Sequence, residues 1–465
     1  MGTERIETDL IGPLPIPGDV LYGVHTRRAE LNFTVSGLRL KDFPELIQSM
    51  AMVKKAAAYA NAELGLLSAE KVSAISAACD ELIELKCVDE NFPVDMMQGG
   101  AGTSTNMNVN EVVANLALWK LGANVGDYDK LHPNDDVNLS QSTNDVYPTA
   151  LRLTILRACE GLIESQVGLR DAFRAKAREY ATALKVGRTQ LQDAVPMTVG
   201  QEFDAFAELI DEDINQLQFA SRLLKEVNLG GSAIGTSINV PRGFPAAACI
   251  HLTQISGIQL IRARNLIEAT SDTGGFVSIS SVLKRIAVKL TKVCNDLRLL
   301  SSGPRGGLGE VRLPPVQAGS SIMPGKVNAV IPEMMNQIAF QVIGNDLTVT
   351  LAASAGQLQL NAMEPVIILN ILQSMRMLTR GMDIFKQRCV AGIEVDVDRC
   401  KDLLDQSLAL ATPLAMLIGY SKAAQLAKKA LAEKRGLRQV VEEEGILASS
   451  QVEELFEGSA TFANF

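Results

Sequence analysis

Apolar residues recur at helical spacing along much of the chain, most clearly between Gln201 and Asn228. Six side chains in this segment are separated by steps of three, four or seven residues: Phe203, Phe206, Ile210, Ile214, Leu217 and Leu224. This spacing places them along one face of a helix, which is typical of a helix in a bundle. Residues 150–185 repeat the pattern, and residues 276–300 and 333–385 predict further long helices.

The last of these segments is apolar around more than one face between residues 338 and 372. Such a helix must be enclosed by neighbours, either within its own subunit or across a subunit interface. Gly356 and Pro365 lie inside the segment and predict a bend or an interruption. Helices this long exceed the average of about 11–12 residues, and together they predict an elongated helical bundle.

The chain divides into three predicted domains. Residues 1–141 are expected to form a mostly helical N-terminal domain, whose first 45 residues are irregular or short-stranded because prolines and glycines interrupt them. Residues 142–395 contain the long helical patterns and are expected to form the central bundle domain. Residues 396–465 are expected to form a small helical C-terminal domain.

Composition limits the possible partners. Hydrophobic residues make up 47% of the 465 residues and charged residues 21%, which is ordinary for a soluble globular protein. The sequence contains no uninterrupted apolar run of about 18 residues, the length that would predict a membrane span. The formal net charge of −9 argues against nucleic acid and anionic membranes as partners. Because the same charge repels small anions, an anionic substrate would need local positive charge.

Cysteine and histidine usage indicates the compartment and excludes some chemistries. The seven cysteines show no CxxC or Cys/His spacing, and the charged start of the chain lacks the apolar core of a signal peptide. We therefore expect reduced thiols and a cytoplasmic protein. His25, His132 and His251 are the three histidines, so a metal site and a histidine-based triad are disfavoured.

Residues 319–328 read GSSIMPGKVN and combine conformational freedom with polar chemistry. Gly319 and Gly325 allow backbone conformations closed to other residues, and Pro324 stiffens the turn between them. Such a segment can bring backbone N–H groups and polar side chains around a small anion. The side chains concerned are Ser320, Ser321, Lys326 and Asn328.

This segment, here called the signature loop, resembles the loop GSSxMPxKxNP of the aspartase/fumarase superfamily. Three further stretches are similar to conserved blocks of that superfamily: QGGAGTSTNMN at 98–108, QSTND at 141–145 and GRTQLQDAVPMTVGQE at 187–202. The resemblance covers nearly the whole chain. It implies a mainly α, three-domain fold, with a central long-helix bundle that forms a multi-helix core in a homotetramer.

Two details resemble aspartate ammonia-lyases more than fumarases. The sequence Gly-Ala-Gly-Thr at 100–103 stands where fumarases usually have Gly-Ser-Gly-Thr, and Glu364-Pro365 stands where they usually have Lys-Pro. The resemblance therefore implies reversible elimination of ammonia from L-aspartate to give fumarate. It implies a small dicarboxylate as the partner and no organic cofactor.

This reaction passes through an aci-carboxylate, which survives only where preorganised donors surround its oxygens. The resemblance implies that Ser320 is the catalytic base, helped by backbone N–H groups and Lys326. It also implies a set of substrate-binding residues: Thr103, Ser142, Thr143, Asn144, Thr189, Gln190, Ser321, Lys326 and Asn328. Each hydroxyl taken alone could instead cap a helix or hold a turn.

Several positions depart from the superfamily pattern and leave alternatives open. Ala329 stands where proline is usual, Asp136 is fumarase-like, and Gln190 stands where many members have histidine, so no general acid is evident. His132 resembles a fumarase segment linked to a secondary anion site, or is a loop histidine held by its neighbours. Alternative functions are a fumarate hydratase, a lyase for another amine leaving group, or a catalytically silent structural homologue.

The spacing of the four blocks predicts how the protein assembles. They are separated by about 40 to more than 100 residues, most of them on or beside long helices. Rigid helices cannot easily return their distant ends to one pocket, whereas neighbouring subunits can supply the blocks together. We therefore expect a homotetramer whose active sites are shared between subunits, with the apolar segment 338–372 at an interface.

Overall fold

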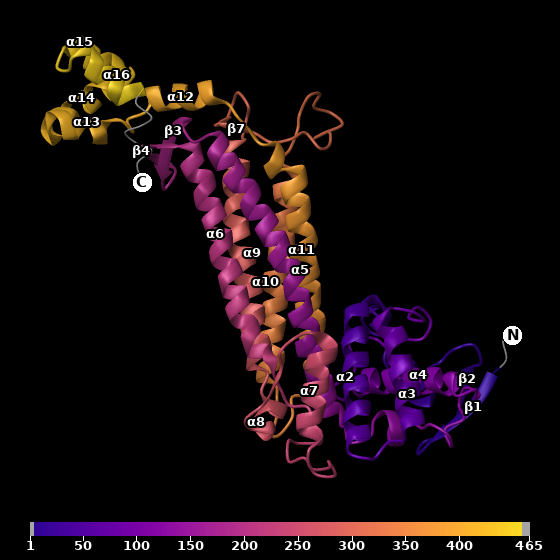
Figure 1. The fold of residues 1–465 in the computed structure, drawn as a ribbon. Coiled ribbons are helices and arrows are strands. Elements are labelled where there is room, and N and C mark those ends of the chain that lie inside the picture. Colours follow the sequence, from indigo (N-terminus) through magenta and orange to yellow (C-terminus); the bar gives the residue numbers. More distant parts are fainter. Residues whose placement is uncertain (1–3, 458–465) are drawn as a thin grey trace. The chain divides into compact units, whose positions relative to one another are not determined.

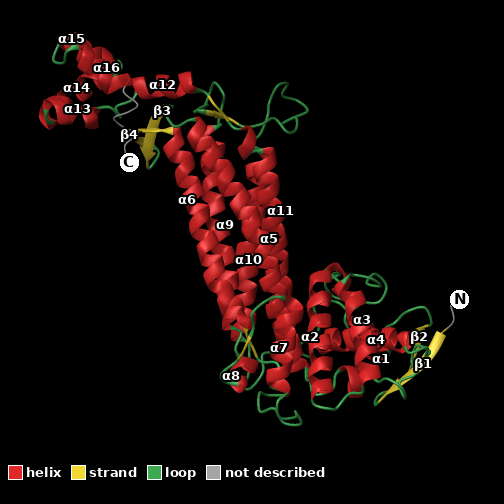
Figure 2. Ribbon diagram, viewed as in Figure 1, coloured by secondary structure: helices red, strands yellow, loops and turns green. Residues whose placement is uncertain are grey.

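The computed structural model describes residues 4–457, and helices dominate these residues (Figures 1 and 2). Five helices are longer than the others: α5 (Thr143–Glu179), α6 (Val199–Ser221), α9 (Gly274–Leu300), α10 (Val330–Ser354) and α11 (Glu364–Arg388). They correspond to the segments in which apolar spacing predicts bundle helices. The mainly α prediction is therefore confirmed.

One predicted helix end is wrong, and one predicted interruption is confirmed. The helix predicted to reach Asn228 ends at Ser221, and Leu224 continues its buried face inside a 3-10 turn. Apolar spacing cannot separate the two helix types at such an end, because both place residues three apart close together. The interruption predicted near Gly356 and Pro365 is confirmed, since α10 ends at Ser354 and α11 begins at Glu364. Pro365 thus lies at the start of a helix, where its missing N–H is tolerated.

The chain folds as two compact units. Among the described residues, the first contains the chain up to Gly161, with Gln216–Lys284 and Gln341–Arg376. The second contains Leu162–Asn215, Arg285–Phe340 and the chain from Met377. The division falls within the five long helices, unlike the three predicted domains, which stay a prediction. Residues 458–465 of the predicted C-terminal domain lie outside the described residues.

The first unit contains the N-terminal part of the chain. Its shorter elements are β1 (Glu4–Asp9), β2 (Gly12–Pro17), α1 (Val24–Asn32), α2 (Pro44–Glu63), α3 (Ala69–Ile83), α4 (Thr103–Lys120), β5 (Glu226–Val227), α7 (Phe244–Ser256), β6 (Ile261–Arg262) and α8 (Leu266–Ser271). β1 and β2 form an antiparallel hairpin, which agrees with the short strands predicted before residue 45, whereas helix α1 in the same region was not predicted. Helix α2 packs against both α3 and α7. Alanines on its buried face allow this close approach.

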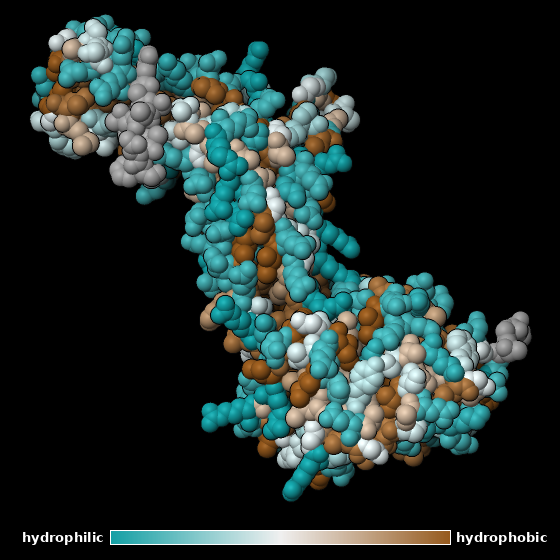
Figure 3. Space-filling view, viewed as in Figure 1, coloured by the Kyte–Doolittle hydropathy of each residue, from teal (hydrophilic) through white to brown (hydrophobic). Residues whose placement is uncertain are grey.

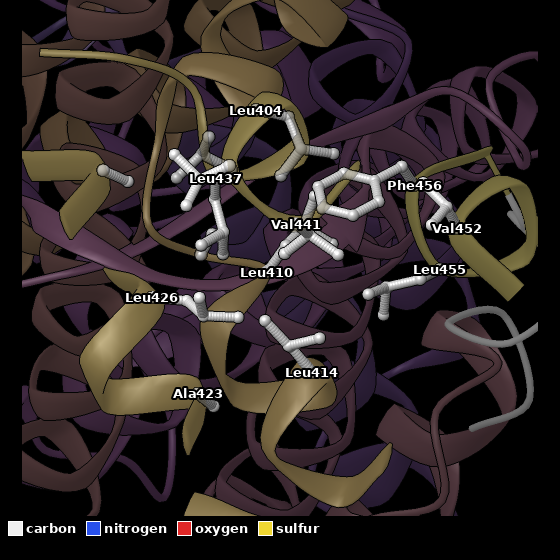
Figure 4. Close-up of a cluster of buried hydrophobic side chains, with 14 residues drawn as sticks. Leu404, Leu410, Leu414, Ala423, Leu426, Leu437, Val441, Val452, Leu455 and Phe456 are labelled. Atoms are coloured by element: carbon white, nitrogen blue, oxygen red, sulfur yellow. The ribbon is translucent and has the colours of Figure 1, made fainter. Parts of the chain in front are cut away.

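The second unit contains two small sheets and the C-terminal helices. Its shorter elements are β3 (Leu184–Thr189), β4 (Gln192–Thr198), β7 (Val311–Arg312), β8 (Glu394–Val395), α12 (Val397–Gln406), α13 (Ala411–Ile418), α14 (Tyr420–Glu433), α15 (Leu437–Glu444) and α16 (Ser449–Glu457). The C-terminal helices enclose their own apolar cluster, in which Leu404, Leu414 and Phe456 are buried (Figure 4). Val186 of β3 belongs to the same cluster, so this hairpin is anchored to the C-terminal helices.

Some large apolar side chains remain exposed. Phe340, Leu347 and Leu351 of α10 are each about 60% exposed, and their steps of seven and four residues place them along one face. Figure 3 shows hydrophobic residues, in brown, reaching the surface among the polar ones. In the part of the chain that the structure describes, no helix combines the length and hydropathy needed to cross a bilayer.

Candidate active site

The first block, QGGAGTSTNMN at 98–108, begins with a turn that only small residues can make. Gly100, Ala101 and Gly102 all have positive φ, and Gly102 immediately precedes α4. A Cβ atom on Gly102 would lie 2.6 Å from Cγ of the buried Tyr147 ring, so glycine is required by both conformation and space. Thr103 follows as an exposed residue, and its hydroxyl donates to the Gly100 carbonyl at 2.7 Å.

The second block begins helix α5 and is half-buried. The Ser142 hydroxyl oxygen accepts a hydrogen bond from the Asn144 N–H at 3.3 Å, which is an ordinary helix cap. Thr143 Oγ1 accepts from Asn106 Nδ2 at 3.1 Å, and Asn144 Nδ2 donates to the Ala233 carbonyl at 2.8 Å. Since Asn106 belongs to the first block, the first unit brings these two predicted blocks together.

Asp145, which sequence analysis quotes but does not assign, organises this region. One carboxylate oxygen accepts from the N–H groups of Gly230 and Ser232 at 3.0 and 2.9 Å, and the other accepts from the Ser142 N–H at 3.0 Å. Burial raises the pKa of Asp145 to about 6, although these donors oppose the rise. Asp145 therefore fixes the loop at 230–232 against the start of α5.

Lys54 is a second residue that sequence analysis misses. Its ammonium is buried and donates to Asn138 Oδ1 at 2.8 Å and to Gln141 Oε1 at 3.0 Å, just before Ser142. Burial lowers the pKa of Lys54 to about 7, against the attraction of Asp145. No signal in the sequence separates Lys54 from its neighbour Lys55, whose ammonium pairs with Asp80.

The third block forms the β3–β4 hairpin of the second unit. Thr189 pairs with Gln192, so Gln190 and Leu191 form a two-residue turn, and both have positive φ. Glycine or asparagine normally fills such turns, and leucine is strained there. Thr189 and Gln190, two predicted substrate-binding residues, are exposed at this tip. Strain of this kind is common at ligand-binding sites.

The signature loop closes on itself. The Gly319 N–H donates to the Lys326 carbonyl at 2.8 Å, and Asn328 Nδ2 donates to the Gly319 carbonyl at 3.3 Å. A Cβ atom on Gly319 would lie 2.5 Å from the Lys326 carbonyl oxygen. Glycine at 319 therefore allows the closure, and the half-buried Ser320 and the exposed Ser321 follow it directly.

Ser320 has the local donor that a serine base requires. Its Oγ accepts a hydrogen bond from the Ile322 N–H at 3.2 Å. A hydrogen bond of this kind also stabilises a turn, which is the alternative role for this hydroxyl. A backbone donor at this position also stabilises negative charge on Oγ and thus favours its deprotonation. Ser321 is exposed beside it.

Beside the signature loop lies a positively charged groove of about 620 Å³, which Lys326 and Asn328 help to line. Its lining contains four cationic side chains, Arg298, Arg312, Lys326 and Arg399, against two carboxylates, Glu333 and Asp396. Lys326 is exposed, and among the described residues no carboxylate lies within ion-pairing distance of it. The groove therefore provides the local positive charge that an anionic substrate would need.

The second unit does not join its two blocks directly. No hydrogen bond between described residues links Thr189 or Gln190 to the signature loop.

His132 makes local hydrogen bonds, because its Nδ1 accepts from the Asn134 and Asp135 N–H groups at 3.1 and 3.2 Å. This geometry is that of the loop histidine considered above.

Another residue singled out in the sequence, Glu364, is the first residue of α11 and is buried. Burial raises its pKa to about 8, and Arg152 opposes this rise. The described residues contain no group of three or more His, Cys, Asp or Glu side chains that could hold a metal ion.

The fold and these loops define a lyase of the aspartase/fumarase type. A family model described as Lyase matches residues 12–344, and one described as fumarase C C-terminus matches residues 410–459. The chain therefore belongs to the Lyase family, as its resemblance predicts.

Individual relatives agree with this assignment. The chain is 55% identical over 448 residues to the aspartate ammonia-lyase of Pseudomonas aeruginosa, covering 96% of this chain and 94% of that relative. It is 49% identical over 453 residues to the aspartate ammonia-lyase of Escherichia coli, covering 97% and 95%. Among solved structures, a fumarate lyase:delta crystallin from Brucella melitensis bound to cobalt superposes with a TM-score of 0.96 at 54% identity, covering 99% of this chain and 100% of that one. A class II fumarase from Schistosoma mansoni gives 0.92 at 33% identity, covering 99% of each chain.

Proposed function

We propose that this protein catalyses the reversible elimination of ammonia from L-aspartate to give fumarate. The observation that carries the proposal is 55% identity over 96% of the chain to an aspartate ammonia-lyase. The closed signature loop, with a backbone donor on Ser320 Oγ and an uncommitted Lys326, supports it. The proposed chemistry requires no organic cofactor.

In the proposed mechanism, the deprotonated Oγ of Ser320 removes a proton from the carbon next to the side-chain carboxylate of aspartate and becomes a hydroxyl. The electron pair of the broken C–H bond moves into that carboxylate and forms the aci-carboxylate. Its two negative charges are stabilised by preorganised donors, with the Lys326 ammonium pairing a substrate carboxylate. The proposed polar partners are the side chains of Thr103, Ser142, Thr143, Asn144, Thr189, Gln190 and Asn328 and the backbone of Ser321. Collapse of the aci-carboxylate forms the C=C bond and expels ammonia.

We also propose a homotetramer with active sites shared between subunits. The exposed Phe340, Leu347 and Leu351 on α10 support it, since large apolar side chains left in water are unfavourable and an interface would cover them. The match at residues 410–459 supports the predicted C-terminal domain. All seven cysteines are free of disulfides, which supports a cytoplasmic location.

The ultraviolet absorbance of fumarate tests the reaction. We expect absorbance to rise with L-aspartate as substrate and to stay flat with L-malate. A fumarate hydratase is the second candidate, favoured by the structural likeness to a class II fumarase. Turnover of malate without turnover of aspartate would establish that alternative and reject the ammonia-lyase.

Subunit exchange tests the shared site. Ser320→Ala and Thr189→Ala variants are each expected to be nearly inactive, because each lacks one part of every site. Mixed tetramers formed by exchange regain some sites in which both residues are present, so partial activity should return. Mixtures that exchange subunits but stay inactive would contradict the arrangement.

A further inference from the structure

A buried cluster of charges lies within the second unit, along strand β3 of the β3–β4 hairpin. The Glu310 side chain is 1% exposed, and one of its oxygens lies 3.0 Å from Lys185 Nζ, while the other lies 2.8 Å from Arg188 Nη1. Lys185 is also buried and lies 2.6 Å from Glu202 Oε2 on α6. Two cations thus face two carboxylates, and the cluster is neutral.

The hairpin has the irregularity that directs both cations to one carboxylate. In a regular strand, Lys185 and Arg188 would point to opposite faces, because side chains alternate. The register of β3 against β4 shifts between Gly187 and Arg188, and such a bulge changes the direction of the residues that follow. A Cβ atom on Gly187 would lie 2.8 Å from the Val195 carbonyl oxygen, so a larger residue would disturb this bulge.

Glu310 is itself held by the backbone around it. Its N–H donates to the Leu300 carbonyl at the end of α9, and its carbonyl accepts from the Asp396 N–H at 3.0 Å. Asp396 in turn accepts from Arg312, which follows Glu310 on the way into the signature loop. The carboxylate of Glu310 therefore stands at a fixed point of the segment that leads to Ser320.

From this geometry we propose that Glu310 is a positioning residue. Through Lys185 and Arg188 it fixes the hairpin tip, with Thr189 and Gln190, to the segment that carries the signature loop. This inference rests on the proposed function, because it assumes that both elements serve the elimination. Glu310 itself touches no substrate in the proposal.

Comparison of the two ion pairs of Glu310 shows which of them holds the hairpin tip. Lys185 keeps Glu202 when Glu310 is lost, whereas Arg188 has no other carboxylate within ion-pairing distance among the described residues. Burial alone would lower the pKa of Lys185, but the two carboxylates more than offset this and raise it. Arg188 directly precedes Thr189, so releasing its guanidinium releases the tip first.

Steady-state kinetics of Arg188→Met test the proposal without leaving a buried carboxylate unpaired, since Lys185 still pairs with Glu310. We expect KM for aspartate to rise at least about tenfold and kcat to fall, because 1 Å of misplacement can cost about a hundredfold in rate. The conservative variant Arg188→Lys should recover most of the loss. Arg170→Met removes the ion pairs of a partly buried arginine with Asp171 and Asp211, all three outside the four blocks in the sequence. It is the matched control and should keep both constants within about twofold.

A second measurement does not depend on turnover. In Glu310→Gln, limited trypsin digestion followed by mass spectrometry should show faster cleavage after Arg305 and Lys326, with unchanged cleavage in the C-terminal helices. Unchanged cleavage in Glu310→Gln, or unchanged KM and kcat in Arg188→Met, would overturn the proposal. If the wild-type protein does not convert aspartate but Glu310→Gln still loosens the signature loop, the proposed function fails while the positioning role stands.

Discussion

The contact between Gly102 and Tyr147 gives a prediction whose size follows from the structure. Gly102 has a φ of +88°, and a Cβ atom there would lie 2.6 Å from Cγ of a ring that is 1% exposed. For alanine, the left-handed conformation costs about 1–2 kcal/mol. Forcing a methyl group into a packed core adds about 1–3 kcal/mol. Gly102→Ala should therefore cost about 2–5 kcal/mol in total.

Gly100→Ala separates the two costs. Gly100 has nearly the same φ, +89°, but its Cβ atom would meet nothing closer than 3.7 Å. This variant should be destabilised by the conformational cost alone, about 1–2 kcal/mol. Because 1 kcal/mol shifts the melting temperature of a unit of this size by about 2–4 °C, Gly102→Ala should melt about 2–12 °C below Gly100→Ala.

The assay is differential scanning calorimetry of both variants, combined with aspartate turnover. Thr103 follows Gly102 directly, so displacing the turn should also lower kcat/KM, by up to about a hundredfold. Gly100→Ala should lose less activity, because its turn has room for the methyl group. Equal melting temperatures and equal activities for the two variants would refute the claim that the Tyr147 ring requires glycine at 102.

The other predictions concern the base, the anion partner and a buried lysine. Ser320→Ala should lower kcat by at least about a hundredfold with little change in substrate affinity, as loss of a role confined to the transition state does; near-normal turnover would reject the base. Lys326→Ala should impair KM and kcat together, because its charge faces a carboxylate in both states; steady-state kinetics that change kcat alone would reject this pairing. Burial lowers the pKa of Lys54 from 10.5 to about 7. Between pH 7 and pH 10.5, Lys54 is therefore protonated in the unfolded chain and largely neutral in the folded one, so its contribution to the free energy of unfolding rises with pH. Urea unfolding should show this rise to be smaller in Lys54→Met, and parallel slopes would contradict it.

The long helices could be predicted because burying one face of a helix requires apolar residues at regular helical spacing in the sequence. Phe203, Phe206 and Leu217 are buried in α6 as their spacing requires. Helix ends were less predictable, since a 3-10 turn continues the same face at Leu224. Helix α1 (Val24–Asn32) was missed, because it shows little amphipathic pattern and lies among glycines and prolines. Periodicity therefore identifies long packed helices better than short ones.

The candidate site could be recognised from its motifs, but the buried charged residues that hold its loops in place could not. Ser320 and Lys326 stand in a segment too specific to be an ordinary loop. Asp145, Lys54 and Glu310 act through partners distant in the sequence: Gly230 and Ser232, Asn138 and Gln141, and Lys185 and Arg188. Such pairings leave no local pattern, because only the folded chain brings the partners together.

The distribution of charge explains why Lys326 is the cation that an anionic substrate can use. The whole chain carries −9, so attraction must come from the groove beside the signature loop. Three of the four cations there already have partners, since Arg312 pairs with Asp396, Arg298 lies 3.7 Å from Glu333, and Arg399 donates to backbone carbonyls. Lys326 pairs with no carboxylate among the described residues and is exposed. A dicarboxylate that binds in the groove therefore meets one free charge, placed six residues from Ser320 in a loop that closes on itself.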